Sequence, residues 1–261
     1  DGDMDIYISN VYAPEGLRIT DWVQRTGYVP SGDGLQHTAR LARGNTLLLN
    51  QGDGTFRDVS EAYGVNRCGW GWGALFVDLD NDRYEDLYAP NGWYTVEGTH
   101  DLTDFFWRFV IARSPASPPP SPEYTIAWTT IEHLSLELHQ TWAGDEHNVV
   151  LLNQGGKRFV DANTLVGPDR PMDARSVAGM DWDRDGRIDL VLKNRNAPRL
   201  QLLHNRSPHG AENGWLVLEL ENRAPNRDAL GAQIRVHAGG QVMRRTVYAG
   251  ACASCHDIGA P

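Results

Sequence analysis

The stretch DWDRDGRIDLVLKN, residues 181–194, decides the fold because it combines a regular run of aspartates with an apolar strand. Its aspartates stand at positions 1, 3, 5 and 9 of a loop, as Asp181, Asp183, Asp185 and Asp189. Oxygen ligands on alternate residues can converge on one Ca²⁺, and position 7 usually adds its backbone carbonyl, here that of Arg187. The stretch lacks the glutamate that an EF-hand has at position 12, so we expect a Ca²⁺ loop inside a β-hairpin.

A second loop of the same form occurs in DLDNDRYEDLYAPN, residues 78–91. It supplies the same ligand positions through Asp78, Asp80, Asp82, Tyr84 and Asp86. Position 6 is Gly186 in the loop that starts at Asp181, where a sharp turn favours glycine. It is Arg83 in the loop that starts at Asp78, which makes that loop a poorer match. The apolar run ALFV precedes this loop, so it too is expected to join two strands.

A partial third copy, DGDMDIYISN, occupies residues 1–10. Asp1, Asp3 and Asp5 fill positions 5, 7 and 9 of the pattern. A solvated acidic turn is the alternative for each loop, but three copies in one register favour a bound cation that offsets the repulsion between carboxylates.

The loops belong to a longer repeat. NTLLLNQGDGTFRDVSEAYGV, which begins at Asn45, matches NVVLLNQGGKRFVDANTLVG, which begins at Asn148, with 103 positions between equivalent residues. The same offset of 103 separates Asp78 from Asp181. Another L-L-x-N segment ends at Asn205, which is 52 positions after Asn153, so the minimal unit has about 52 residues.

Each full unit contains four short strand patterns, which are TLLLNQ, TFRDVS, ALFVDLD and EDLYAPN in the first copy. Four strands in roughly 50 residues are typical of one β-propeller blade. We therefore expect an all-β fold with about three propeller blades, one of them partial, with helical insertions and a small β domain after them. A β-sandwich with two similar hairpins is the alternative.

Two insertions, at about residues 11–42 and 92–146, fall at equivalent places in the repeat, so both should lie on one rim. Helices are expected in THDLTDFFWRFVIARS, with Asp101 or Thr103 as N-cap, and in YTIAWTTIEHLSLELHQTW. The segment SPASPPPSP between them reads as a stiff linker. The aromatic residues of these helices are expected to pack on the blades.

Composition limits the classes of function. The net charge of −10 does not favour nucleic-acid binding. The sequence contains no run of 18 apolar residues, so it does not predict a transmembrane helix. Three cysteines do not make a disulfide-rich scaffold, and Cys68 is expected to be a small buried residue. No Ser-His-Asp order, P-loop or HExxH motif occurs, so we do not expect an enzyme.

The strand–DxDxDGxxD–strand units resemble FG-GAP/VCBS-type repeats, and residues 213–250 resemble the ASPIC/UnbV domain. The residues that match the latter are Trp215, Asn226, Arg227, Gly231, Ala232, Arg235, Val236, Gly239 and Gly250. The resemblance implies a calcium-binding propeller of about seven blades in the periplasm or outside the cell. A partner protein or a further copy would then complete the ring. The resemblance divides the chain into the repeats (1–210), an ASPIC/UnbV-like domain (211–251) and a tail (252–261).

The tail ACASCHDIGAP contains Cys252, Cys255 and His256 in the C-x-x-C-H pattern of c-type haem attachment. It also resembles the start of a cytochrome c domain. A disulfide between Cys252 and Cys255, free thiols, or a metal shared with a partner are the alternatives. Two functions follow: a scaffold that carries haem c for electron transfer with a redox partner, or a haem-free module whose rim binds a glycan or a protein.

Overall fold

The computed structural model describes residues 4–27, 39–97, 100–115, 119–164, 172–208, 214–218 and 220–248. Most regular structure in these residues is antiparallel β-sheet, with a few helices. The first sheet is β1 (Ile6–Ile8), β2 (Thr46–Asn50) and β3 (Phe56–Asp58). The second is β4 (Leu75–Val77), β5 (Asp86–Ala89), β6 (Val149–Asn153) and β7 (Phe159–Asp161). The third is β8 (Ala174–Met180), β9 (Asp189–Asn194) and β10 (Leu200–Leu203).

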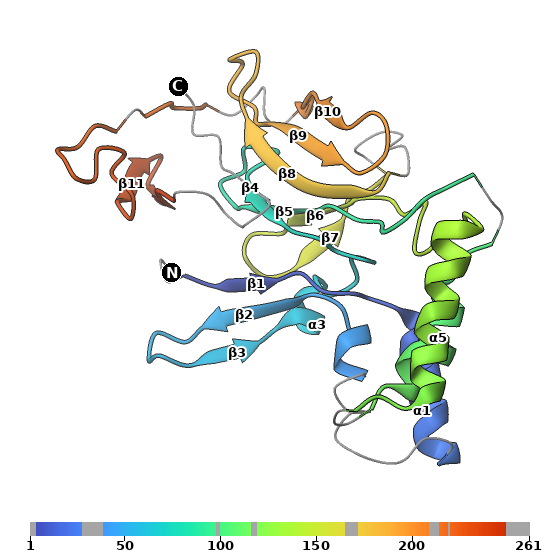
Figure 1. The fold of residues 1–261 in the computed structure, drawn as a ribbon. Helices are drawn as coiled ribbons and strands as arrows, with labels where there is room; N and C mark the ends of the chain where they lie inside the picture. Colours follow the sequence, from blue (N-terminus) through green and yellow to red (C-terminus); the bar gives the residue numbers. More distant parts are fainter. Residues whose placement is uncertain are drawn as a thin grey trace.

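The three sheets follow one another like adjacent blades, with the β4–β7 sheet in the middle (Figure 1). Both faces of this middle sheet are covered, and all four residues of β5 are buried. Leu87 and Ala89 face a core shared with β2, whereas Tyr88 faces a core shared with β8 and β9. Complete burial of a leucine side chain contributes about 1.5–3 kcal/mol, so these two cores hold the blades together. The all-β class expected from the sequence is confirmed.

The predicted blade boundary is wrong by two strands. The sequence suggested that the strands beginning at Thr46 and Leu75 share one blade, but β2 and β3 pair with β1, whereas β4 and β5 pair with β6 and β7. A tandem repeat has no inherent first residue, so its period does not reveal where one sheet ends. The connection from β3 to β4, which contains α3 (Ser60–Tyr63), crosses between sheets instead of closing a hairpin.

The insertions pack together at one end of the sheets, as expected. The first contains α1 (Pro14–Thr26). The second contains α4 (Thr103–Phe105), the π-helical η1 (Phe106–Val110), the short 3₁₀ helix η2 (Ile111–Arg113), α5 (Pro122–Glu132) and its π-helical continuation η3 (His133–Glu137). Gly16 of α1 lies on the indole of Trp107, where an added Cβ would be 2.6 Å from the ring. The N-cap of α4 is Leu102, so the prediction of Asp101 or Thr103 is wrong by one residue. Asp101 nevertheless accepts the backbone N–H of Thr103 at 2.7 Å, which satisfies a free donor at the helix start.

A ladder of tryptophans connects the second insertion to the blades. Trp72 stacks on Trp93 with ring centroids 4.7 Å apart, and the guanidinium of Arg175 lies 4.4 Å from the Trp72 centroid. Trp93 also stacks on Trp70 at 5.7 Å. Because other rings and Arg175 cover these aromatic faces, the ladder is a packing element.

Of the aromatic residues in the second predicted helical segment, Trp142 packs against Trp70 at 5.8 Å, whereas Trp128 packs on Phe106 and Tyr124 within the insertion. These rings pack as expected, but mainly on one another and only in part on the blades.

The C-terminal part forms a separate two-stranded sheet of β11 (Gln233–Ala238) and β12 (Gln241–Thr246). It lies at the end of the blades opposite the helical insertions (Figure 1). Cys68 is fully buried, as predicted. No helix among the described residues has the length and apolar character needed to cross a membrane.

Candidate metal centre

Both complete Asp-rich loops connect the first two strands of a sheet. The first Asp loop (residues 78–86) runs from β4 to β5, and the second Asp loop (residues 181–189) runs from β8 to β9. The β5 strand begins at the first Asp loop and leads to the second insertion, so loops and helices occupy opposite ends of the blades (Figure 1). The prediction that each loop lies inside a β-hairpin is confirmed.

The two loops have the same backbone conformation. Residues at position 4, Asn81 and Arg184, have φ of 56° and 61°. Residues at position 6, Arg83 and Gly186, have φ of 86° and 85°. Arg83 therefore adopts the turn for which glycine is the usual residue, at a steric cost of about 1–2 kcal/mol. The arginine at position 6 does not change the course of the first Asp loop.

The aspartate at position 1 stabilises this turn in both copies. Asp78 accepts the backbone N–H of Asp82 at 3.0 Å and that of Arg83 at 2.9 Å. Asp181 accepts the N–H groups of Asp185 and Gly186, both at 3.0 Å. These bonds fold the backbone of each loop around one carboxylate.

The aspartate at position 9 is the most deeply buried group of each loop: Asp86 and Asp189 are each 1% exposed. One carboxylate oxygen accepts a backbone N–H from within the loop, from Leu79 to Asp86 and from Trp182 to Asp189, both at 2.9 Å. The other oxygen accepts the backbone N–H of an asparagine in a neighbouring strand. That donor is Asn153 for Asp86 at 2.8 Å.

This aspartate–asparagine bond occurs in all three sheets. Asn205 donates to Asp189 at 2.7 Å, and Asn50 donates to Asp5 at 2.8 Å. The asparagine side chains reciprocate by donating to the carbonyl before each aspartate, as Asn153 does to Glu85 at 3.0 Å. Sequence reasoning had aligned these asparagines without giving them a role. Their recurrence at the same place in each repeat is the sequence signal from which this pairing could have been predicted.

Three carboxylates converge in each loop, at positions 1, 3 and 9. Oxygen atoms of Asp78, Asp80 and Asp86 lie within 4.8 Å of one another, as do those of Asp181, Asp183 and Asp189. Position 5 belongs to neither of these two trios: Asp82 accepts the N–H of Tyr84, whereas Asp185 pairs with Arg187 and converges with Asp183 and His204 in a separate group. Such an all-oxygen set suits a hard cation such as Ca²⁺. The side chains present therefore fit the predicted ion at three of the four aspartate positions.

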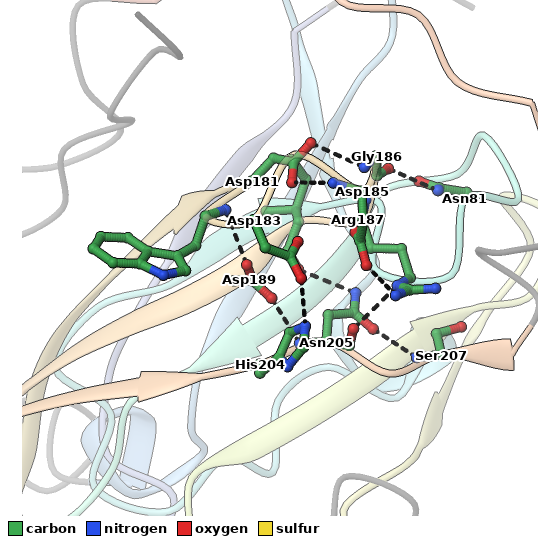
Figure 2. A network of polar contacts seen from close by, with 12 residues as sticks. Asn81, Asp181, Asp183, Asp185, Gly186, Arg187, Asp189, His204, Asn205 and Ser207 are labelled. Carbon is green, nitrogen blue, oxygen red and sulfur yellow. Dashed lines mark hydrogen bonds and ion pairs between the residues drawn. The ribbon is translucent and has the colours of Figure 1, made fainter.

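The second Asp loop has neighbours of its own (Figure 2). His204 lies 3.0 Å from Asp183 through Nε2 and Oδ2. The side chain of Asn81 reaches across from the first loop and donates to the Gly186 carbonyl at 3.0 Å. Asn205 returns a bond to the carbonyl of Leu79 at 2.7 Å. The two loops are therefore joined to one another as well as to their own strands.

Burial makes the carboxylates of the first Asp loop costly to ionise. It raises the pKa of Asp86 to about 7, and the nearby charges of Asp80 and Asp78 add to the rise. It also raises the pKa of Asp78 to about 6, although the guanidinium of Arg245 opposes that rise. A cation among these oxygens would favour their charged form.

The remaining predicted site residues lie outside the described part of the chain. This applies to Asp1 and Asp3 of the partial copy and to Cys252, Cys255 and His256 of the terminal motif. Asp5 is described and makes the aspartate–asparagine bond with Asn50. Tyr84 and Arg187 occupy position 7, and their backbone N–H groups bond to the aspartates at position 5.

An open pocket of about 410 Å³ lies at the opposite end of the blades, between the two insertions. Its acidic lining consists of Glu15, Asp101, Asp145 and Glu146, with His100 beside them. Glu146 accepts the backbone N–H of Trp70 at 2.9 Å, and burial raises its pKa to about 7. Sequence reasoning did not identify this pocket because its residues come from two insertions that are far apart along the chain.

Comparison with known proteins agrees with the repeat analysis. The FG-GAP-like repeat family matches residues 1–89, which include the first Asp loop. Cartilage acidic protein 1 from Homo sapiens is 27% identical over 197 residues, covering 66% of this chain and 28% of the human protein. Cartilage acidic protein 1 from Mus musculus gives the same values. The chain thus spans about 28% of the length of these relatives and is similar, over its first third, to FG-GAP-like repeats.

Proposed function

We propose that the chain is a propeller-type scaffold whose two complete Asp loops each bind one Ca²⁺. The observation that carries this proposal is the convergence of three carboxylates in two loops whose φ angles match at positions 4 and 6. Asp78, Asp80 and Asp86 would hold one ion, with the carbonyl of Tyr84 as a further ligand. Asp181, Asp183 and Asp189 would hold the other, with the carbonyl of Arg187. The ion offsets the repulsion between carboxylates and stabilises the hairpin.

The proposal includes a third site in the partial copy, where Asp5 is the aspartate at position 9. Asp5 would belong to a site completed by Asp1 and Asp3, which lie outside the described residues. A direct test is to equilibrate the purified chain by dialysis with millimolar CaCl₂ and to measure the metal bound in excess of the dialysis buffer by atomic emission. At least two Ca²⁺ per chain support the proposal. No bound metal after dialysis would show that the loops are closed by hydrogen bonds alone.

The proposed location is outside the cytosol, in the periplasm or the extracellular space. Ca²⁺ loops of millimolar to micromolar affinity are filled in compartments where the free ion is abundant. The similarity to FG-GAP-like repeats and to cartilage acidic protein 1 supports a binding or scaffold role. A glycan or a protein is the proposed ligand of the blades, and no catalytic step is part of this role.

A second element of the proposal is covalent haem c at the C-terminal motif. Cys252 and Cys255 would form the two thioether bonds, and His256 would be an axial ligand. The scaffold would then display a redox centre for electron transfer with a partner protein. An absorption spectrum of the natively expressed chain separates the possibilities. A Soret band with α and β bands after reduction supports haem, and their absence would favour the haem-free binding module with a Cys252–Cys255 disulfide.

A further inference from the structure

The β12 strand contacts the first Asp loop through an arginine. Arg245 places Nη2 3.3 Å from Oδ2 of Asp78 and Nε 3.6 Å from Oε1 of Glu85. The side chain of Asp78 is 17% exposed and that of Arg245 is 40% exposed, so the pair is partly shielded from water. Shielding makes this contact stronger than an ordinary surface ion pair.

A second contact joins the same C-terminal region to the second Asp loop. The indole of Trp215 lies against Gly186, where an added Cβ would be only 2.2 Å from Cδ1. Residues 214–248 therefore reach both Asp loops, one through a charge and the other through an aromatic ring. An isolated two-stranded hairpin is only marginally stable in water, so these contacts help to hold β11 and β12 in place.

The two Asp loops differ at position 1 because of this arrangement. Asp78 pairs with Arg245, whereas no ion pair to Asp181 occurs among the residues that the structure describes. The second Asp loop has an arginine of its own, but Arg187 pairs with Asp185, which lies outside the converging trio. A guanidinium thus contacts a carboxylate of the trio at positions 1, 3 and 9 in the first loop and not in the second.

We infer that Arg245 is a tethered cation that competes with Ca²⁺ for Asp78. The inference rests on the proposed calcium sites and goes beyond them. A divalent ion beside Asp78 would repel the guanidinium and take part of the carboxylate charge with which it pairs. The first Asp loop therefore binds Ca²⁺ more weakly than the second. By reciprocity, Ca²⁺ in the first loop weakens the attachment of the β11–β12 hairpin.

Calorimetric titration of the full chain with CaCl₂ tests this competition. The wild-type chain should show a stronger and a weaker class of site. Arg245→Gln should tighten the weaker class about three- to tenfold, because one nearby positive charge is lost. Arg235→Gln is the matched control, since it removes the same charge from the neighbouring strand, where the side chain is exposed. The control should change either affinity by less than about twofold.

Hydrogen–deuterium exchange provides the reciprocal measurement and does not depend on a mutation. Amides of residues 233–246 should exchange faster in CaCl₂ than in EDTA, because Ca²⁺ releases Arg245. Arg245→Lys, which keeps the charge, should restore wild-type Ca²⁺ affinity if Arg245→Gln tightens binding through charge.

The outcomes separate this inference from the calcium proposal. Binding of Ca²⁺ that is identical in wild type and Arg245→Gln, or hairpin exchange that slows in CaCl₂, would overturn the competition and leave the calcium sites intact. Absence of Ca²⁺ binding in both proteins would overturn the calcium proposal and the competition together.

Discussion

The backbone N–H of Asn153 donates to the buried carboxylate of Asp86 at 2.8 Å, and this bond joins the Asp-rich hairpin to the next strand of its sheet. Its counterparts link Asn205 to Asp189 and Asn50 to Asp5. The carboxylate thus fixes the loop on one side and the neighbouring strand on the other. The proposed metal site and the assembly of the sheet therefore share this residue.

Replacing Asp86 with asparagine should destabilise the chain in EDTA by about 1–3 kcal/mol, measured by urea unfolding. Both carboxylate oxygens accept backbone N–H groups, from Leu79 and Asn153. An amide offers one acceptor and turns its NH₂ toward the other donor, which stays buried and unpaired. Asp5→Asn is the control: Asp5 is exposed, so water can replace the lost bond. Equal stability of the two variants would contradict the structural role of Asp86.

Gly186→Ala should cost more than Gly54→Ala, although both glycines have nearly the same backbone angle. Their φ values are 85° and 87°, so each alanine pays about 1–2 kcal/mol for the left-handed conformation. Gly54 has open space around it, whereas Gly186 contacts Trp215. The extra cost at Gly186 should appear in thermal unfolding together with a shift in tryptophan fluorescence. A matching loss in both variants would mean that Trp215 does not rest on this loop.

Arg83→Gly should stabilise the chain by about 0.5–1 kcal/mol, because arginine at φ 86° is strained and glycine is not. The gain is smaller than the full strain, since glycine also makes the unfolded chain more flexible. Chemical unfolding with metal removed gives the comparison. A loss of stability would show that contacts of the arginine side chain outweigh the backbone strain.

Glu146 should make stability depend on pH between about 4.5 and 7. Its ordinary pKa is 4.5 and burial raises the pKa in the folded chain to about 7, so the folded state binds the proton more tightly. Stability is therefore highest below the lower value and falls as the pH rises through the upper one. Relative to Glu146→Gln, wild type should lose on the order of 2 kcal/mol from pH 5 to pH 8. Parallel pH profiles of the two proteins would place Glu146 in a solvated environment.

The sequence predicted those features that repeat or have a local cause. The spacing of Asp78 and Asp181 predicted two equivalent loops inside hairpins, and the shared position of the insertions predicted that they lie at one end. The burial of Cys68 was also predicted. Each depends on residue type and periodicity, which a single sequence contains.

The features that were missed depend on contacts between distant residues. The blade boundary was placed incorrectly because hydrogen bonds between β5 and β6 bridge an insertion of more than 50 residues. The pairing of Arg245 with Asp78 joins positions 167 apart, and nothing in the local sequence around either residue indicates the partner. The position-5 aspartates were expected to converge with the other three of their loop, but Asp82 accepts a backbone N–H, and Asp185 pairs with Arg187 and converges with Asp183 and His204 instead.

The central claim is that Ca²⁺ in the two Asp loops stabilises the blades. Its most direct test is thermal unfolding in CaCl₂ and in EDTA, for wild type and for the double variant Asp78→Asn/Asp181→Asn. At a concentration 100 times the dissociation constant, each site adds about 2.7 kcal/mol, which corresponds to about 5–10 °C in a chain of this size. The account predicts a rise of this order for each of the two sites in wild type, and a clearly smaller rise for the double variant, which keeps only the partial copy that contains Asp5. An equal melting temperature of wild type in CaCl₂ and in EDTA would contradict it.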